Sequence, residues 1–194
     1  MRISEKTTAL LISQKIVQVE DKEIYEYGFD LILADLFNFS MILFVGGACG
    51  QLVPAVMYLL VFVGLRSFCG GYHAKTHLRC HIVTIGVFVF FLILLNMPQL
   101  TDRKALLLWG DFIALIPVLL FSPITHANKP LSEDARKRNR LLSIGLFLLM
   151  ILCAIILTYF GRQEGTVISL TLWIVSLCMI PAIDIRSLKE RKKS

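Results

Sequence analysis

Long apolar runs without charge constrain this chain more than any other feature. Residues 141–160, LLSIGLFLLMILCAIILTYF, contain no charged side chain. About 20 apolar residues are enough to cross the hydrocarbon core of a bilayer as a helix. The whole chain is 56% hydrophobic and only 18% charged, with a mean hydropathy of +0.72, far from the composition of soluble domains. The sequence therefore predicts an integral membrane protein.

Six apolar segments of this kind predict an all-α, polytopic membrane domain over residues 29–183. The segments are 29–46, 51–65, 81–96, 105–122, 141–160 and 166–183. The polar residues inside them include Asp30, Asp35, Asn38 and Asp111. Polar residues inside a span are costly and often functional, so a non-enzymatic transporter that depends on these carboxylates is one alternative.

The N-terminal segment, residues 1–28, has a different pattern. Apolar residues recur at every seventh position, at Ile3, Leu10, Val17 and Ile24, among many charged residues. This pattern predicts an amphipathic helix that lies at the membrane interface, with a helix packed on the protein core as the alternative. Residues 184–194 predict a basic cytoplasmic tail.

The distribution of Lys and Arg predicts the orientation in the cell membrane. With the N-terminus inside, 17 of the 20 basic residues fall on the cytoplasmic side and three fall outside. The positive-inside rule therefore places both termini and the 66–80 loop in the cytoplasm. The basic residues cluster at the ends of spans and lack interleaved aromatics, so the net charge of +6 does not indicate nucleic-acid binding.

The loop 123–140 carries a second concentration of basic residues, including Lys129, Arg136, Lys137 and Arg138. These side chains can attract anionic lipid or an acidic peptide, or can serve topology alone. Ser132, followed by two acidic residues, predicts the start of a helix within this loop.

The five cysteines do not suggest a disulfide framework. Cys49, Cys153 and Cys178 fall in apolar runs, so we expect small buried side chains there. Cys69 and Cys80 instead share the polar stretch RSFCGGYHAKTHLRCH, residues 66–81, which lies between two apolar spans.

Pairs of Cys and His in this stretch are candidates for nucleophilic catalysis, because an imidazole can take the proton of a thiol. Cys69 and His73 are four residues apart and His77 and Cys80 are three apart, which suits one helix face. His73 and Cys80 are seven apart, about 10 Å along a helix, and can meet only if the chain bends.

Other residues of the stretch each have two interpretations. Gly70 and Gly71 allow the chain to bend. Their amides can stabilise an oxyanion, or the two glycines can form a simple turn with no catalytic role. Arg66 either supports the site or caps its helix. His73, His77 and His81 have the spacing of metal ligands on one helix face, so a histidine-liganded membrane metalloenzyme is a second alternative.

The pattern R-x3-GGYHA-x-T-x3-C, from Arg66 to Cys80, resembles the signature of the accessory gene regulator B family. The members of this family are multi-spanning cysteine endopeptidases that process quorum-sensing propeptides in Gram-positive bacteria. The likeness extends to chain length, span number and the later P-x4-NKPL segment from Pro123 to Leu131.

The resemblance implies that Cys80 is the nucleophile and His73 the base, with Arg66, Gly70 and Gly71 supporting the site. It implies cleavage of a small amphipathic propeptide through a thioester on Cys80, followed by thiolactone or lactone closure of the autoinducing peptide. Lys129 and the 136–138 cluster would hold the acidic part of the propeptide. No cofactor is needed for this chemistry, and the family likeness implies a homodimer.

Overall fold

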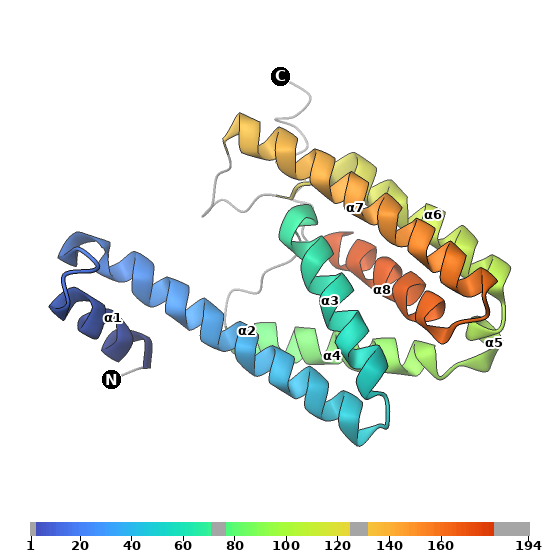
Figure 1. The fold of residues 1–194 in the computed structure, drawn as a ribbon, viewed down its shortest axis with the longest axis horizontal. Helices are drawn as coiled ribbons and strands as arrows, with labels where there is room; N and C mark the ends of the chain where they lie inside the picture. The colour runs from blue at the N-terminus through green and yellow to red at the C-terminus, as the bar shows by residue number, and fades with distance from the viewer. Residues whose placement is uncertain (1–2, 71–76, 125–131, 181–194) are drawn as a thin grey trace.

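The computed structural model describes residues 3–70, 77–124 and 132–180, and all regular elements in these ranges are helical (Figure 1). The all-α class expected from the apolar runs is therefore confirmed. Gly71, His73 and Lys129, three of the predicted site residues, lie outside the described ranges.

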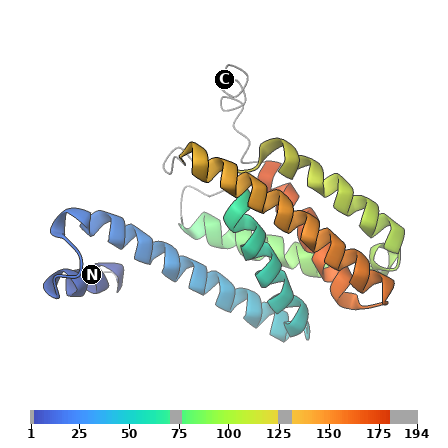
Figure 2. The same cartoon turned by 45° about the horizontal axis from the view of Figure 1, so that its top comes forward.

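The N-terminal segment forms two helices rather than one amphipathic helix over residues 1–28. α1 (Ile3–Ser13) is followed by a turn in which Lys15 has a φ of 59°, and by the short 3-10 helix η1 (Val19–Asp21). α2 (Lys22–Ala48) then runs on through the first predicted span. The heptad spacing of apolar residues did not reveal this break, because a hydrophobic pattern can continue across a turn. α1 and the first half of α2 project away from the other helices (Figures 1 and 2).

Each of the remaining long helices covers most of one predicted span, and the short α5 lies between two of them. These helices are α3 (Leu52–Cys69), α4 (His77–Leu95), α5 (Pro98–Thr101), α6 (Lys104–Phe121), α7 (Glu133–Tyr159) and α8 (Gln163–Met179). Among the described residues, five helical segments are long and apolar enough to cross a membrane, and α8 is shorter. About six spans are thus consistent with the structure.

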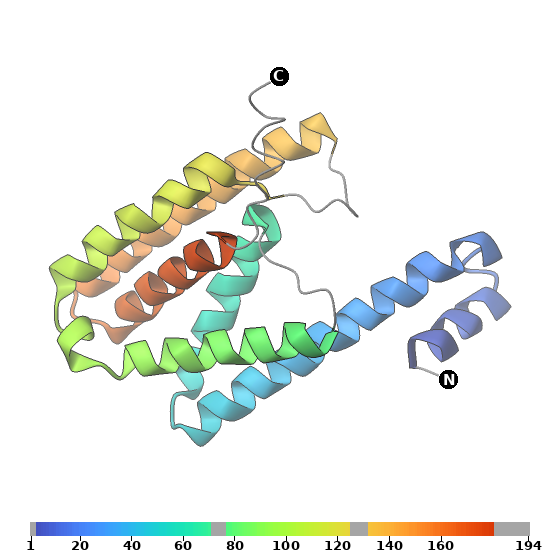
Figure 3. The same ribbon diagram turned by 180° about the vertical axis from the view of Figure 1, so that it is seen from behind.

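α8 is the central helix of the bundle. It contacts α3, α4, α6 and α7, which surround it in the view from behind (Figure 3). Its buried residues fall on every side of the helix, as in a helix that is enclosed by others. Gly165 permits a close approach to α7, where a Cβ would collide with Thr158.

Polar side chains connect α8 to α6 within the apolar interior. Ser169 Oγ donates a hydrogen bond to Asp111 Oδ2 at 2.7 Å, and Trp173 Nε1 donates to Asp111 Oδ1 at 3.0 Å. Ser176 Oγ donates to the carbonyl of Ala114 one turn further on. Asp111, which the sequence left as a candidate transport residue, is fully buried and accepts two hydrogen bonds from α8.

The helix ends gather at two sides of the bundle. The ends of α3 and α6 and the starts of α4 and α7 lie toward one side, whereas α5 and the α7–α8 connection lie toward the other (Figures 1 and 3). The first side is the one that the charge distribution predicts to be cytoplasmic.

Candidate active site

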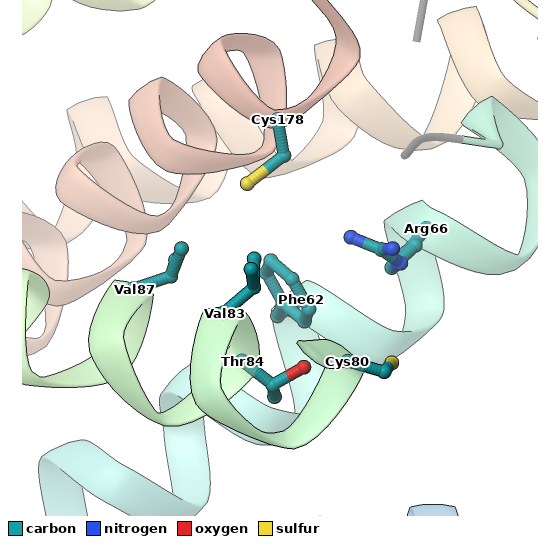
Figure 4. Close-up of a pocket in the computed structure, with 7 residues that line it drawn as sticks. All are labelled: Phe62, Arg66, Cys80, Val83, Thr84, Val87 and Cys178. Carbon is teal, nitrogen blue, oxygen red and sulfur yellow. The ribbon is translucent and has the colours of Figure 1, made fainter. Parts of the chain in front are cut away.

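Cys80 lies in the first turn of α4, three residues after the helix begins at His77. Its side chain is half-buried and lines a pocket between α3, α4 and α8 (Figure 4). The lining residues are Phe62, Arg66, Cys80, Val83, Thr84, Val87 and Cys178. A thiol in this position is reachable from the pocket and is surrounded mainly by apolar groups.

Arg66, in the last turn of α3, shares this pocket with Cys80. Its guanidinium lies over the ring of Phe62, with 5.5 Å between the guanidinium carbon and the ring centroid. Such a contact orients the guanidinium group. The structure therefore brings together two of the predicted site residues.

The wall behind these residues is an aromatic cluster between α3 and α4. Tyr58 stacks on Phe62 and packs against Phe88 and Phe91, with ring centroids 4.8 to 5.2 Å apart. Tyr58, Phe88 and Phe91 are fully buried. This cluster fixes the position of α3 relative to α4 and so holds Arg66 beside Cys80.

Gly70 ends α3 with a φ of 75°, in the region that favours glycine. Its amide donates to the carbonyl of Arg66 at 3.0 Å, as at many helix ends. The backbone of Ile124 lies directly against Gly70, and a Cβ there would collide with the Ile124 carbonyl oxygen. In this arrangement Gly70 permits a turn and a close backbone contact, and its amide already has a partner.

Cys69 and Cys80 differ sharply in accessibility. Cys69 is 0% exposed, and the amide of Ile124 donates to its carbonyl at 3.0 Å as the chain after α6 crosses the end of α3. Cys80 is only partly covered and opens into the pocket. Of the two cysteines in the polar stretch, only Cys80 can meet a substrate without rearrangement.

His81, next to Cys80, is oriented toward α2. Its Nδ1 donates to Asn38 Oδ1 at 2.7 Å, and its ring packs edge-on against Phe37. Within the described residues no group of three His, Cys, Asp or Glu side chains is arranged to hold a metal. His73 and the side chain of His77 lie outside the described part of the chain, so their place in a ligand set is not tested.

The basic cluster Arg136, Lys137 and Arg138 lies on the first turns of α7 and is exposed. The helix starts where the sequence predicted, since Ser132 Oγ accepts a hydrogen bond from the amide of Ala135. These three residues do not line the pocket of Cys80. Any role in substrate binding would involve a part of the substrate that is remote from the thiol.

Sequence reasoning missed Cys178 and the contribution of α8 to the pocket. Cys153 and Cys178 were expected to be buried, but both are half-buried, and the sulfur of Cys178 points into the pocket (Figure 4). The expectation for Cys49 was wrong as well, because it is exposed just after α2 ends. The spacing of Val83, Thr84 and Val87 from Cys80 predicts that these residues share one face of α4. No sequence pattern predicts that this face lies opposite α8.

Comparisons with a family model and with known proteins indicate the same family. The family model described as "Accessory gene regulator B" matches residues 4–181. A "Putative AgrB-like protein" of Listeria innocua is 28% identical over 153 residues, covering 76% of this chain and 73% of the relative. An "Accessory gene regulator protein B" of Staphylococcus aureus strain JH9 is 29% identical over 143 residues, covering 70% and 72%. No solved structure matches the chain significantly.

Proposed function

The chain belongs to the accessory gene regulator B family, and we propose that it is a membrane-embedded cysteine endopeptidase that processes a small quorum-sensing propeptide. Membership supports a role in the accessory gene regulator system. The peptidase mechanism is our proposal, and the pocket around Cys80 is the observation that carries it.

The first step forms a thioester. His73 takes the proton of the Cys80 thiol, and the sulfur attacks a peptide carbonyl near the C-terminal part of the propeptide. When the carbon–nitrogen bond breaks, the proton passes from His73 to the departing amine. The retained part of the propeptide is then an acyl group on Cys80, and the C-terminal fragment leaves.

The second step closes a ring. A thiol or hydroxyl within the retained peptide attacks the thioester carbonyl and loses its proton to His73. The bond between the carbonyl carbon and the Cys80 sulfur then breaks, and His73 returns the proton to that sulfur. The product is a thiolactone or a lactone. Exchange of one thioester for another is nearly balanced in free energy, whereas hydrolysis runs downhill, so cyclisation requires that water be kept away.

Three features of the pocket support this chemistry. Cys80 is accessible while Cys69 is sealed under the segment at Ile124. Arg66 lines the same pocket as Cys80, and in this proposal its positive charge stabilises the carbonyl oxygen that becomes negative during attack. Apolar side chains, including Val83 and Val87, border the thiol and limit the access of water.

The proposal is tested with the purified protein in lipid vesicles and its cognate propeptide. Cys80→Ala and His73→Ala should each abolish cleavage, read by mass spectrometry. Cys178→Ala is the matched control, because it removes a thiol from the same pocket and should leave most of the activity. Cleavage by Cys80→Ala would refute the proposal.

The same assay separates the two alternatives. A histidine-liganded metalloenzyme would lose activity to a chelator and survive alkylation of Cys80. A transporter would move peptide without cutting it and would depend on Asp111 or another carboxylate in a span. We expect cleavage that a chelator does not affect and that thiol alkylation stops.

A further inference from the structure

An apolar groove extends from Cys80 along α4. A second pocket adjoins the first and shares Arg66, Val83, Val87 and Cys178 with it. Phe90, Ile174 and Leu177 complete the lining. Because the two pockets share these four residues, we treat them as one groove, with α4 on one wall, α8 on the other and Arg66 of α3 beside them. We call this feature the α4–α8 groove.

The α4 wall is one face of the helix. Cys80, Val83, Thr84, Val87 and Phe90 follow the spacing at which residues of an α-helix lie above one another. From Cys80 to Phe90 this face is about 15 Å long. An extended peptide of about four residues has a similar length.

The lining residues determine which substrate side chains the groove can bind. Beyond Cys80 the walls are almost wholly aliphatic or aromatic, and Arg66 is the only charged side chain among the described residues that line it. An apolar side chain gains free energy there, whereas a charged or strongly polar one would lose hydration.

Arg66 also determines which side of the cut lies in the groove. Cleavage turns the leaving fragment into an amine, which becomes a cation near neutral pH. A cation beside the Arg66 guanidinium is repelled, but the thioester carbonyl of the retained part is not. The retained part, and not the leaving fragment, therefore fits the groove.

Resting on the function proposed above, we propose that the α4–α8 groove is the specificity pocket for the acyl side of the substrate. It selects propeptides whose residues at and just before the cut have large apolar side chains. The same contacts keep the thioester covered until the ring closes. Val83, Val87, Phe90, Ile174 and Leu177 set the preference.

The test uses peptidyl chloromethyl ketones, which occupy only the acyl side. Acetyl-Gly-Gly-Phe and acetyl-Gly-Gly-Gly chloromethyl ketones are added to the protein in phosphatidylcholine vesicles containing phosphatidylglycerol. The Cys80 sulfur displaces chloride and forms a carbon–sulfur bond, and peptide mass spectrometry locates the label. A Leu78→Cys, Cys80→Ala protein gives the reference rate, since Leu78 is in the same helix turn but 69% exposed.

We expect the Phe probe to label Cys80 at least about tenfold faster than the Gly probe, relative to the reference thiol. Val87→Trp should fill the groove and bring this ratio close to one. Leu177→Trp fills it from the other wall at a position that is 53% exposed, so folding is not at risk. Val89→Trp, on the opposite face of α4, should keep the ratio.

Two results would overturn the inference. One is a ratio near one in the unchanged protein. The other is a ratio that neither groove-filling variant alters, which would mean that the groove holds lipid and the preference arises elsewhere. The His73→Ala variant separates this inference from the proposed function. It should slow the labelling of Cys80 by both probes equally and leave the ratio of the two labelling rates unchanged. If His73→Ala slows neither probe, the proposed function fails while the groove inference stands.

Discussion

Gly70 has a backbone conformation that other residues rarely adopt, at a point where two distant segments touch. With φ at 75° it turns the chain out of α3, and it leaves room for the backbone of Ile124. The end of α3 is thus held against the chain that leaves α6. The requirement for glycine here follows from sterics and not from an oxyanion amide, since that amide already donates to Arg66.

Gly70→Ala is therefore expected to be damaging. A residue with a Cβ pays about 1–3 kcal/mol for this backbone conformation, with φ at 75° and ψ at −165°, and the collision with Ile124 adds to this. We predict a lower melting temperature in detergent and a loss of cleavage. Gly64→Ala is the control, because Gly64 is helical, lies in the same helix and has open space around it, so stability should be unchanged or slightly higher. Equal effects of the two substitutions would contradict this account.

At the scale of residues the sequence allowed part of the site to be predicted. The polar stretch contained several candidate residues, and the family resemblance selected Cys80 as the nucleophile with Arg66 in support. The structure brings these two residues to one pocket. The proximity of Cys69 to the histidines in sequence was a poor guide, because burial removes Cys69 from solvent. Neither the contact between Gly70 and Ile124 nor the position of Cys178 could be predicted, since each depends on segments more than 50 residues apart.

At the scale of helices, α8 is held in register by a few polar contacts. Trp173 lies over Gly110 and donates to Asp111, and Ser169 donates to the other carboxylate oxygen. Ile174, next to Trp173, and Leu177, one turn later, form a wall of the α4–α8 groove. The hydrogen bonds in the bundle interior thus define the position of a pocket wall that lies further along the same helix.

Asp111→Ala should destabilise the bundle by leaving Trp173 and Ser169 without an acceptor. Each unpaired buried donor costs about 1–3 kcal/mol. In a Trp173→Phe background the same change should cost less, and thermal unfolding of the four proteins in detergent measures the coupling. Additive effects would mean that the two side chains do not interact. Asp111→Asn, which retains an acceptor, should still cleave propeptide, whereas a transporter that depends on this carboxylate would fail.

Hydropathy predicted the spans but not the full helices. α7 begins at Glu133, eight residues before the predicted span at 141, and α2 begins at Lys22, seven before 29. Charged residues can continue a helix into water, so hydropathy marks the membrane stretch rather than the end of the helix. The central place of α8 was also not predicted, because all the spans are apolar and composition alone does not rank them.

At the scale of the whole molecule, the helix ends at two sides of the bundle agree with the alternation of charged loops. The side with the starts of α4 and α7 carries Cys80, in the first turn of α4, and the basic cluster, in the first turns of α7 (Figure 1). We predict that a cysteine at Glu133 labels with an impermeant reagent only from the cytoplasm, and one at Asp102 only from outside. Both positions are exposed. Labelling of the two from the same side would contradict the topology.

The central claim is that Cys80 carries the acyl group, and trapping that group tests it most directly. If the internal Cys or Ser of the cognate propeptide is replaced by Ala, ring closure has no nucleophile, but Cys80 can still expel the C-terminal fragment. Intact-protein mass spectrometry should then show the retained peptide on Cys80, releasable by hydroxylamine and slow to hydrolyse. An uncleaved propeptide, or free linear peptide with no adduct on Cys80, would contradict the account.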